Sequence, residues 1–197
     1  MKRIYVFKRF ERFWHWAQAL LILSMIVTGF EIHGTWHLLG FPIAVAIHEK
    51  AAWLLITLWV FAIFWHFTTG EWRQYIPTTD KLLAMIRYYA FGIFTHQHNP
   101  YKQTLLRKHN PLQRIAYLFL KLFLNPLIWI TGLLMLFYAD WPALGIDLSR
   151  PVIVRLHLTG AFLMLVFLIV HLYLVTAGHT IGAHMKAMLT GYEEVED

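Results

Sequence analysis

VIVRLHLTGAFLMLVFLIVHLYLVTAG, residues Val152–Gly178, is an apolar run long enough to cross a lipid bilayer as a single helix. It carries two histidines, His157 and His171, fourteen positions apart. On a helix this offset turns the two side chains to within roughly 40° of each other and separates them by ~21 Å along the axis. Because ionisable side chains inside a membrane span are costly, the pair needs an explanation. Two stacked haems, each taking one axial ligand from this helix, explain it better than two histidines that hydrogen-bond between helices.

The composition of the 197-residue chain is that of a helical membrane protein. Hydrophobic residues make up 58% of it and charged residues 14%, whereas a soluble domain carries about a quarter charged. Four apolar runs are long enough to span a bilayer, at residues 13–32, 43–69, 112–138 and 152–178. We therefore expect an all-α membrane protein, a four-transmembrane-helix bundle that forms a single membrane domain over residues 1–197. The connection 70–111 is expected to contain an amphipathic interfacial helix at 80–94.

The distribution of lysine and arginine predicts the orientation of the chain. Basic residues concentrate in the N-terminal segment 2–12 and in the connection 70–111, whereas residues 30–46 contain none. By the positive-inside rule, both termini and the long connection should be cytoplasmic, in a multi-pass protein of the bacterial inner (plasma) membrane. The net charge of +6 lies at the membrane ends rather than in a solvated basic patch, so no nucleic-acid partner is expected. The C-terminal stretch, which ends in the acidic Glu193–Asp197, is expected to be mobile.

The chain contains no cysteine but twelve histidines. The lack of cysteine excludes covalent c-type haem attachment, cysteine-ligated iron–sulfur clusters and disulfides. Any redox group must therefore be held by histidine, methionine or oxygen. Two of the histidines, His33 and His37, lie in the first connection with no supporting ligands nearby, and we expect them to be solvated.

Depth in the membrane sorts the remaining candidate ligands. His48 and His157 lie near the periplasmic ends of the second and fourth predicted spans. On the cytoplasmic side His171 can pair with His15 of the first span or with His66 of the second, and depth does not choose between them. Antiparallel packing brings such pairs to matching depths, where two neutral imidazoles can hold one haem iron from both faces. Six-coordinate iron favours electron transfer over oxygen activation, and the two irons would lie ~20 Å apart.

Other residues near these depths could contact the haems. Arg155 near the outer pair, and Arg9 or Arg12 near the inner pair, could bind propionates or serve only as interfacial anchors. Gly29 lies fourteen residues after His15 and so shares its helix face. A glycine there could let a flat ligand approach the backbone, or could allow close helix packing.

The histidine pattern and an R-x-x-H-W motif at the start of the first span resemble the bacterial cytochrome b561 superfamily over essentially the whole chain. Within it, the likeness is greatest to the cytochrome b subunits of nickel–iron hydrogenases, formate dehydrogenases and thiosulfate reductases. The resemblance implies that His48 and His157 ligate a periplasmic-side haem b. It implies that His15 and His171 ligate a second, cytoplasmic-side haem b, and so favours His15 over His66.

The same resemblance implies a quinone site. In the formate dehydrogenase type, quinone lies beside the cytoplasmic haem near an asparagine in a K-Y-N-x-x-Q-K segment, and this chain reads KHNPLQR at Lys108–Arg114. Asn110, His109 and Gln113 are therefore the implied contacts of a menaquinone or ubiquinone. The proline and leucine that follow Asn110 depart from the small residues of the family, and Asn110 could instead serve only as a helix cap. His66 is the reserve candidate for a propionate contact or for quinone proton exchange.

The sequence thus predicts a di-haem b-type cytochrome subunit that carries electrons across the inner membrane in a respiratory chain. Its partners would be membrane lipid, a quinone pool and a periplasmic or membrane-attached redox subunit, either a metalloenzyme or a multihaem cytochrome. No catalytic centre for a soluble substrate is expected in this chain. One alternative is a stand-alone b561-type superoxide:quinone oxidoreductase. Others are a haem-free transporter whose histidines relay protons, and a purely structural anchor.

Overall fold

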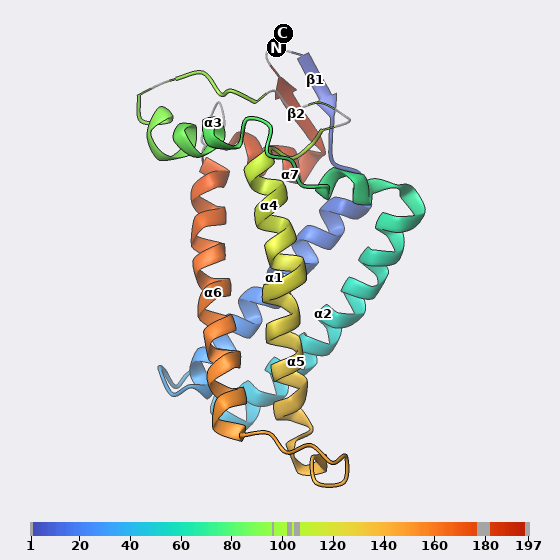
Figure 1. The fold of residues 1–197 in the computed structure, drawn as a ribbon, viewed down its shortest axis with the longest axis vertical. Helices are drawn as coiled ribbons and strands as arrows, with labels where there is room; N and C mark the ends of the chain where they lie inside the picture. Colours follow the sequence, from blue (N-terminus) through green and yellow to red (C-terminus); the bar gives the residue numbers. More distant parts are fainter. Residues whose placement is uncertain (1, 96, 102–103, 105–106, 177–181, 196–197) are drawn as a thin grey trace. The chain divides into compact units, whose positions relative to one another are not determined.

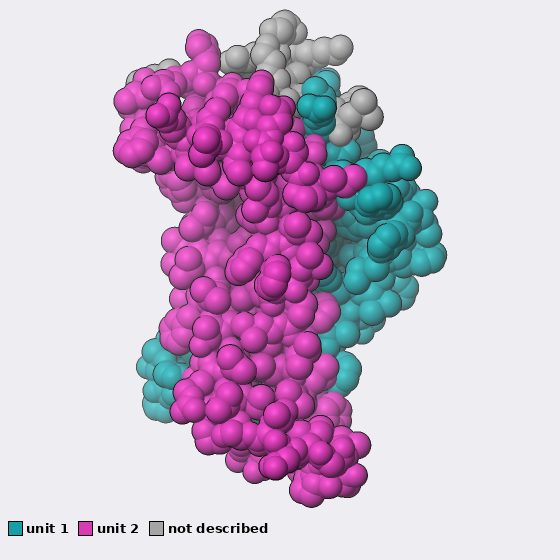
Figure 2. Space-filling view, viewed as in Figure 1, with its two compact units in different colours: residues 1–74, 103–108, 181–197 teal, residues 75–102, 109–180 magenta. Residues whose placement is uncertain are grey.

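The computed structural model describes residues 2–95, 97–101, 104, 107–176 and 182–195. Within these residues, four helical segments are long and apolar enough to cross a membrane: Arg9–Ile32, Phe41–Thr69, Pro111–Leu136 and Arg150–Thr176 (Figure 1). The prediction of an all-α protein with four spans is confirmed, although residues 177–178 of the fourth predicted span lie outside the described residues. The chain divides into two compact units, which are coloured separately in Figure 2 and described one at a time below.

The first unit is built on the packing of α1 (Arg9–Ile32) against α2 (Phe41–Thr69). The buried carboxylate of Glu31 closes the turn between them, because its Oε1 accepts hydrogen bonds from the backbone N–H groups of residues 38–40 at 2.6–3.1 Å. These donors come just before a helix start and have no partner in the helix itself, so Glu31 acts as a distant cap for α2. Gly70, in the left-handed conformation at φ 76°, ends α2 and leads into a 3₁₀ turn at Glu71–Tyr75.

The two ends of the chain meet in the same unit. Strand β1 (Lys2–Tyr5) pairs antiparallel with β2 (Tyr192–Val195), which follows the short helix α7 (Ala183–Thr190). Side chains of α1 bind carbonyls in the last turn of α7: Arg12 donates to Leu189 at 2.5 Å and Trp16 donates to Met188 at 3.2 Å. The expected mobility of the C-terminal stretch is therefore wrong for residues 182–195, because strand pairing and these two hydrogen bonds hold it in place.

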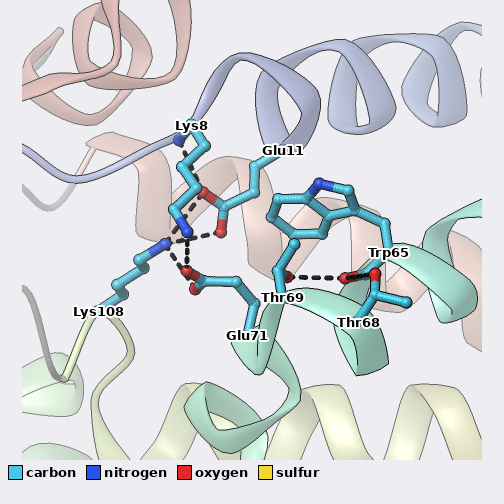
Figure 3. Close-up of polar contacts among 7 residues, drawn as sticks. All are labelled: Lys8, Glu11, Trp65, Thr68, Thr69, Glu71 and Lys108. Atoms are coloured by element: carbon cyan, nitrogen blue, oxygen red, sulfur yellow. Dashed lines mark hydrogen bonds and ion pairs between the residues drawn. The ribbon is translucent and has the colours of Figure 1, made fainter.

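A cluster of four charges centred on the buried Lys108 lies near the start of α1 in this unit (Figure 3). Lys108 is only 4% exposed and its ammonium donates to Glu11 at 2.9 and 3.0 Å and to Glu71 at 2.9 Å. Lys8 forms an ion pair with Glu71 at 2.6 Å, and its backbone N–H donates to Glu11. Burial, the largest effect, would raise the pKa of Glu71, but hydrogen bonds and charges from the two lysines together lower it below its ordinary value.

The second unit contains the remaining helices. In chain order they are α3 (Leu82–Arg87), a π-helical turn (Tyr88–Gly92), α4 (Pro111–Phe119), a second π-helical turn (Leu120–Leu124), α5 (Asn125–Leu136), a 3₁₀ turn (Tyr138–Asp140) and α6 (Arg150–Thr176). The helix expected at 80–94 is thus observed over residues 82–92. The helix begins after Lys81 because the φ of this residue is 58°, a left-handed conformation that cannot be part of a right-handed helix.

Two features shape the third span and its contact with α6. Pro126 has no N–H to donate to the preceding turn, and the backbone there widens so that the Asn125 N–H binds the carbonyl of Leu120. Further along, Gly160 of α6 faces Ile128 of α5 so closely that an added Cβ would lie 2.6 Å from the isoleucine Cγ1. The glycine therefore sets the close approach of α5 and α6.

The charge cluster yields a first prediction. Lys108→Met removes the central cation, which leaves the buried carboxylate of Glu11 without an ion-pair partner and Glu71 with Lys8 alone, so the free energy of unfolding should fall by about 3 kcal/mol or more. The matched control is Lys8→Met, because Lys8 is 49% exposed and its ion pair is screened by water, and it should cost less than about 1 kcal/mol. Thermal unfolding in detergent compares the two variants, and equal losses would contradict the central role of Lys108.

Candidate functional site

His48, near the start of α2, packs against the far end of α1. Its Nδ1 lies 3.0 Å from the hydroxyl of Thr28, which is 2% exposed. A Cβ added to the next residue, Gly29, would lie 3.4 Å from Cε1 of His48, so the glycine faces the imidazole ring. Thr28 is thirteen residues beyond His15, or about 20 Å along the helix. His15 and His48 therefore lie at opposite ends of this helix pair.

The second unit builds the same arrangement around His157 of α6. Its Nδ1 lies 3.0 Å from the hydroxyl of Thr131 and 3.1 Å from the carbonyl oxygen of Ile128, both on α5. A Cβ added to Gly132 would lie 3.2 Å from Cε1 of His157. A Thr-Gly dipeptide thus supports a histidine in each unit. Neither threonine was among the residues predicted from the sequence, and the Thr-Gly pair is not a specific signal, because it also occurs at residues 69–70 and 159–160.

The other two predicted ligands have aromatic neighbours. His171 lies fourteen residues after His157 on the continuous helix α6, and its ring stacks on Phe167 with 6.2 Å between centroids. His15 is half-buried on α1 and meets Trp16 edge to face at 5.1 Å. Each unit by itself therefore carries one predicted ligand toward each of its two ends.

His66, the rival of His15, lies toward the same end of the first unit. It is 6% exposed, and its ring meets the indoles of Trp14 and Trp65 edge to face, both with 5.1 Å between centroids. Its Nδ1 lies 2.6 Å from the carbonyl oxygen of Ala62, one turn earlier in α2. His66 is thus buried against two indoles of its own unit, one of them from Trp14, the residue that precedes His15.

Two of the predicted quinone contacts form a helix cap. The Asn110 side chain accepts a hydrogen bond from the backbone N–H of Gln113 at 2.9 Å, and the Gln113 side chain accepts one from the backbone N–H of Asn110 at 3.0 Å. This reciprocal arrangement is a capping box. The Asn110 amide also donates to the hydroxyl of Tyr89, whose pKa burial raises to about 12. The capping role considered for Asn110 is therefore present, and a quinone contact stays a prediction.

The remaining candidates have more varied surroundings. His109 lies in an aromatic cluster, with its ring 5.2 Å from that of Tyr75 and 5.1 Å from that of Tyr117. Arg155 is exposed on α6, and Arg12 binds the last turn of α7 as described above. The structure therefore gives Arg12 a structural bond in addition to the propionate role predicted for it.

The histidines are suited to haem rather than to a metal ion held by protein side chains alone. Among the described residues there is no group of three or more His, Cys, Asp or Glu side chains that could hold a metal ion together. A haem needs only one imidazole from each side, because the porphyrin supplies the other four iron ligands. Histidines on apolar helices, with a glycine facing two of the rings, fit that requirement.

A family model described as "Prokaryotic cytochrome b561" matches residues 6–191, almost the whole chain. The chain belongs to the prokaryotic cytochrome b561 family. Together with the four apolar helices, this makes it a bacterial membrane protein and a b-type cytochrome that transfers electrons. Membership in the b561 family implies that it binds b-type haem. The resemblance seen in the sequence is therefore confirmed.

Two curated relatives support the assignment to the b561 family. The Escherichia coli protein named "Putative cytochrome YdhU" is 30% identical over 201 residues, which cover 97% of this chain and 75% of that protein. The Cupriavidus necator protein named "Probable Ni/Fe-hydrogenase B-type cytochrome subunit" is 26% identical over 242 residues, covering 100% of this chain and 89% of that protein. No solved structure matches the chain significantly.

The two glycines allow a prediction about the space beside each ring. In Gly132→Ala the new methyl group would press on His157 at 3.2 Å and force the ring to shift, at a cost of about 1 kcal/mol or roughly fivefold in haem retention. In the matched control Gly29→Ala the contact of 3.4 Å with His48 is an ordinary one, so haem retention should stay near that of the unmodified protein. Haem content after purification gives the comparison, and the reverse order would contradict this account.

Proposed function

We propose that the chain carries electrons across the inner membrane through two haem b groups, between a quinone pool and a periplasmic redox partner. The observation that supports this most is the placement of histidines within each unit. His15 and His48 lie at opposite ends of the α1–α2 pair, and His157 and His171 lie fourteen residues apart on α6. In the proposed arrangement His48 pairs with His157 on the periplasmic side. The other two histidines pair on the cytoplasmic side, so each haem would have two histidine ligands.

When bound, haem supplies reversible one-electron chemistry. The four histidines of the proposed ligand set would hold the two haems, and two imidazoles on each iron would favour electron transfer over oxygen activation. The apolar residues of the four spans exclude water from the path between the two depths. Arg155 and Arg12 are proposed to bind propionates, with Arg12 also keeping its bond to α7.

We further propose that a menaquinone or ubiquinone binds near His109, Asn110 and Gln113. Because Asn110 and Gln113 are used in capping α4, their contribution would be to fix the backbone, and the imidazole of His109 would be the group that contacts the quinone. His66 is the reserve candidate for a propionate contact or for proton exchange with the quinone. The positive-inside asymmetry supports cytoplasmic positions for both termini and for this site.

The proposed partner is a redox enzyme subunit on the periplasmic side of the membrane. The name of the Cupriavidus necator relative describes that protein as a probable hydrogenase cytochrome subunit. All of this chain aligns with 89% of that protein. We therefore favour a subunit of a larger complex over a stand-alone superoxide:quinone oxidoreductase. The assignment to a cytochrome family also favours it over a haem-free proton-relay transporter.

Single alanine substitutions test the ligand assignment. Each of four variants should lose one of two haems, about half the haem content, because one axial bond of a bis-histidine set is removed: His15→Ala, His48→Ala, His157→Ala and His171→Ala. The matched controls are His66→Ala on α2 and His37→Ala in the α1–α2 connection, which should keep both haems. Reduced-minus-oxidised spectra and redox titration of the purified variants give the haem content and the number of titrating centres.

The variant His66→Ala also distinguishes between His15 and His66 as the ligand of the cytoplasmic-side haem. If His66→Ala loses a haem while His15→Ala keeps both, the inner ligand is His66 and the assignment made from the family pattern is wrong. If all four variants keep the spectrum of the unmodified protein, the di-haem proposal itself is contradicted.

A further inference from the structure

We infer that Thr28 and Thr131 are positioning residues that hold His48 and His157 in the tautomer with its proton on Nδ1. In that tautomer the other ring nitrogen, Nε2, carries the lone pair that iron needs. The inference rests on the proposed function, since it concerns the two histidines assigned to one haem. It adds to that function two residues that would not touch the haem but would act through its ligands.

The hydrogen bonds of Thr28 determine the direction of its bond with His48. The Thr28 hydroxyl donates to the backbone carbonyl of Ser24, one turn earlier in α1, at 2.8 Å. A hydroxyl has a single proton to donate, so toward His48 at 3.0 Å its oxygen must accept. If the hydroxyl instead donated to the ring, two oxygen acceptors would face each other at 2.8 Å. The arrangement therefore requires an Nδ1–H on His48.

The second unit leads to the same result by an independent route. Nδ1 of His157 lies 3.1 Å from the carbonyl oxygen of Ile128, and a carbonyl can only accept a hydrogen bond. The Thr131 hydroxyl, 3.0 Å from the same nitrogen, donates to the carbonyl of Leu127 at 2.5 Å and so is also placed to accept. Both neighbours thus select the Nδ1–H tautomer of His157.

Burial makes these bonds effective. Thr28 is 2% exposed and Thr131 is 4% exposed, so within the apolar spans water does not readily replace either hydroxyl. An acceptor on the distal N–H of a ligating imidazole fixes the orientation of the ring and makes the ligand more basic. A more basic ligand favours the oxidised, more positively charged iron. Each threonine should therefore lower the reduction potential of the haem held by His48 and His157.

The experiment uses the full-length protein purified with haem, in the variants Thr28→Val and Thr131→Val. Valine keeps the shape of threonine but removes the acceptor. Controls are Thr57→Val on α2 and Thr159→Val on α6, exposed threonines whose hydroxyls donate to the carbonyl four residues earlier in their own helix. Potentiometric titration gives the midpoint of each haem, and electron paramagnetic resonance reports the axial ligands.

We expect the midpoint potential of the haem assigned to His48 and His157 to rise in both threonine variants. The midpoint potential of the other haem should stay unchanged. Haem affinity at that centre should weaken on the order of 10-fold in Thr28→Val. The carbonyl of Ile128 keeps the tautomer of His157, so Thr131→Val should shift the midpoint while the haem is retained. Thr28→Ser should restore the original midpoint, and both control variants should titrate like the unmodified protein.

The outcomes separate this inference from the proposed function. If the unmodified protein binds two haems but the threonine variants titrate like it, the inference falls and the proposed function stands. If both midpoints move equally in Thr28→Val and also in Thr57→Val, the effect is one of general packing and the inference falls. If the unmodified protein binds no haem, both fall. Should Thr28→Val fail to fold, Thr28→Ala removes the same acceptor without placing a methyl group against the imidazole, and it carries the same expectation.

Discussion

A neutral imidazole inside a membrane span must have a hydrogen-bond partner, because hydrocarbon offers no water to replace one. In each unit of this cytochrome a buried threonine on the neighbouring helix provides that partner, to His48 in one and to His157 in the other. The glycine after each threonine faces the same ring. These hydrogen bonds join α1 to α2 and α5 to α6.

Charged groups follow a different pattern from these neutral ones. The buried ion pairs of Lys108 with Glu11 and Glu71 lie at the ends of the first two spans, where the chain leaves the apolar segment. Glu31 is buried at the other end of α1, where it caps the start of α2. The spans themselves thus present mostly neutral hydrogen-bonding groups, and formal charges stabilise the turns and termini that connect them.

The sequence was sufficient for those features that depend on composition and spacing. The four spans follow from continuous apolar runs, and the two depths of histidine follow from the fourteen-residue offset between His157 and His171. It was not sufficient where a partner comes from a distant segment. Thr28 and Thr131 are unremarkable in a helix until the neighbouring helix is placed beside them. The strand pairing of residues 192–195 likewise depends on the N-terminal strand at the opposite end of the chain.

The most direct measurement is the ratio of haem b to polypeptide in the purified, unmodified protein, determined by the pyridine haemochrome method alongside quantitative amino-acid analysis. The account predicts two haem b per chain, because the four histidines of the proposed ligand set would hold two haems. A ratio of one, or the absence of haem from protein made with ample haem supply, would contradict it.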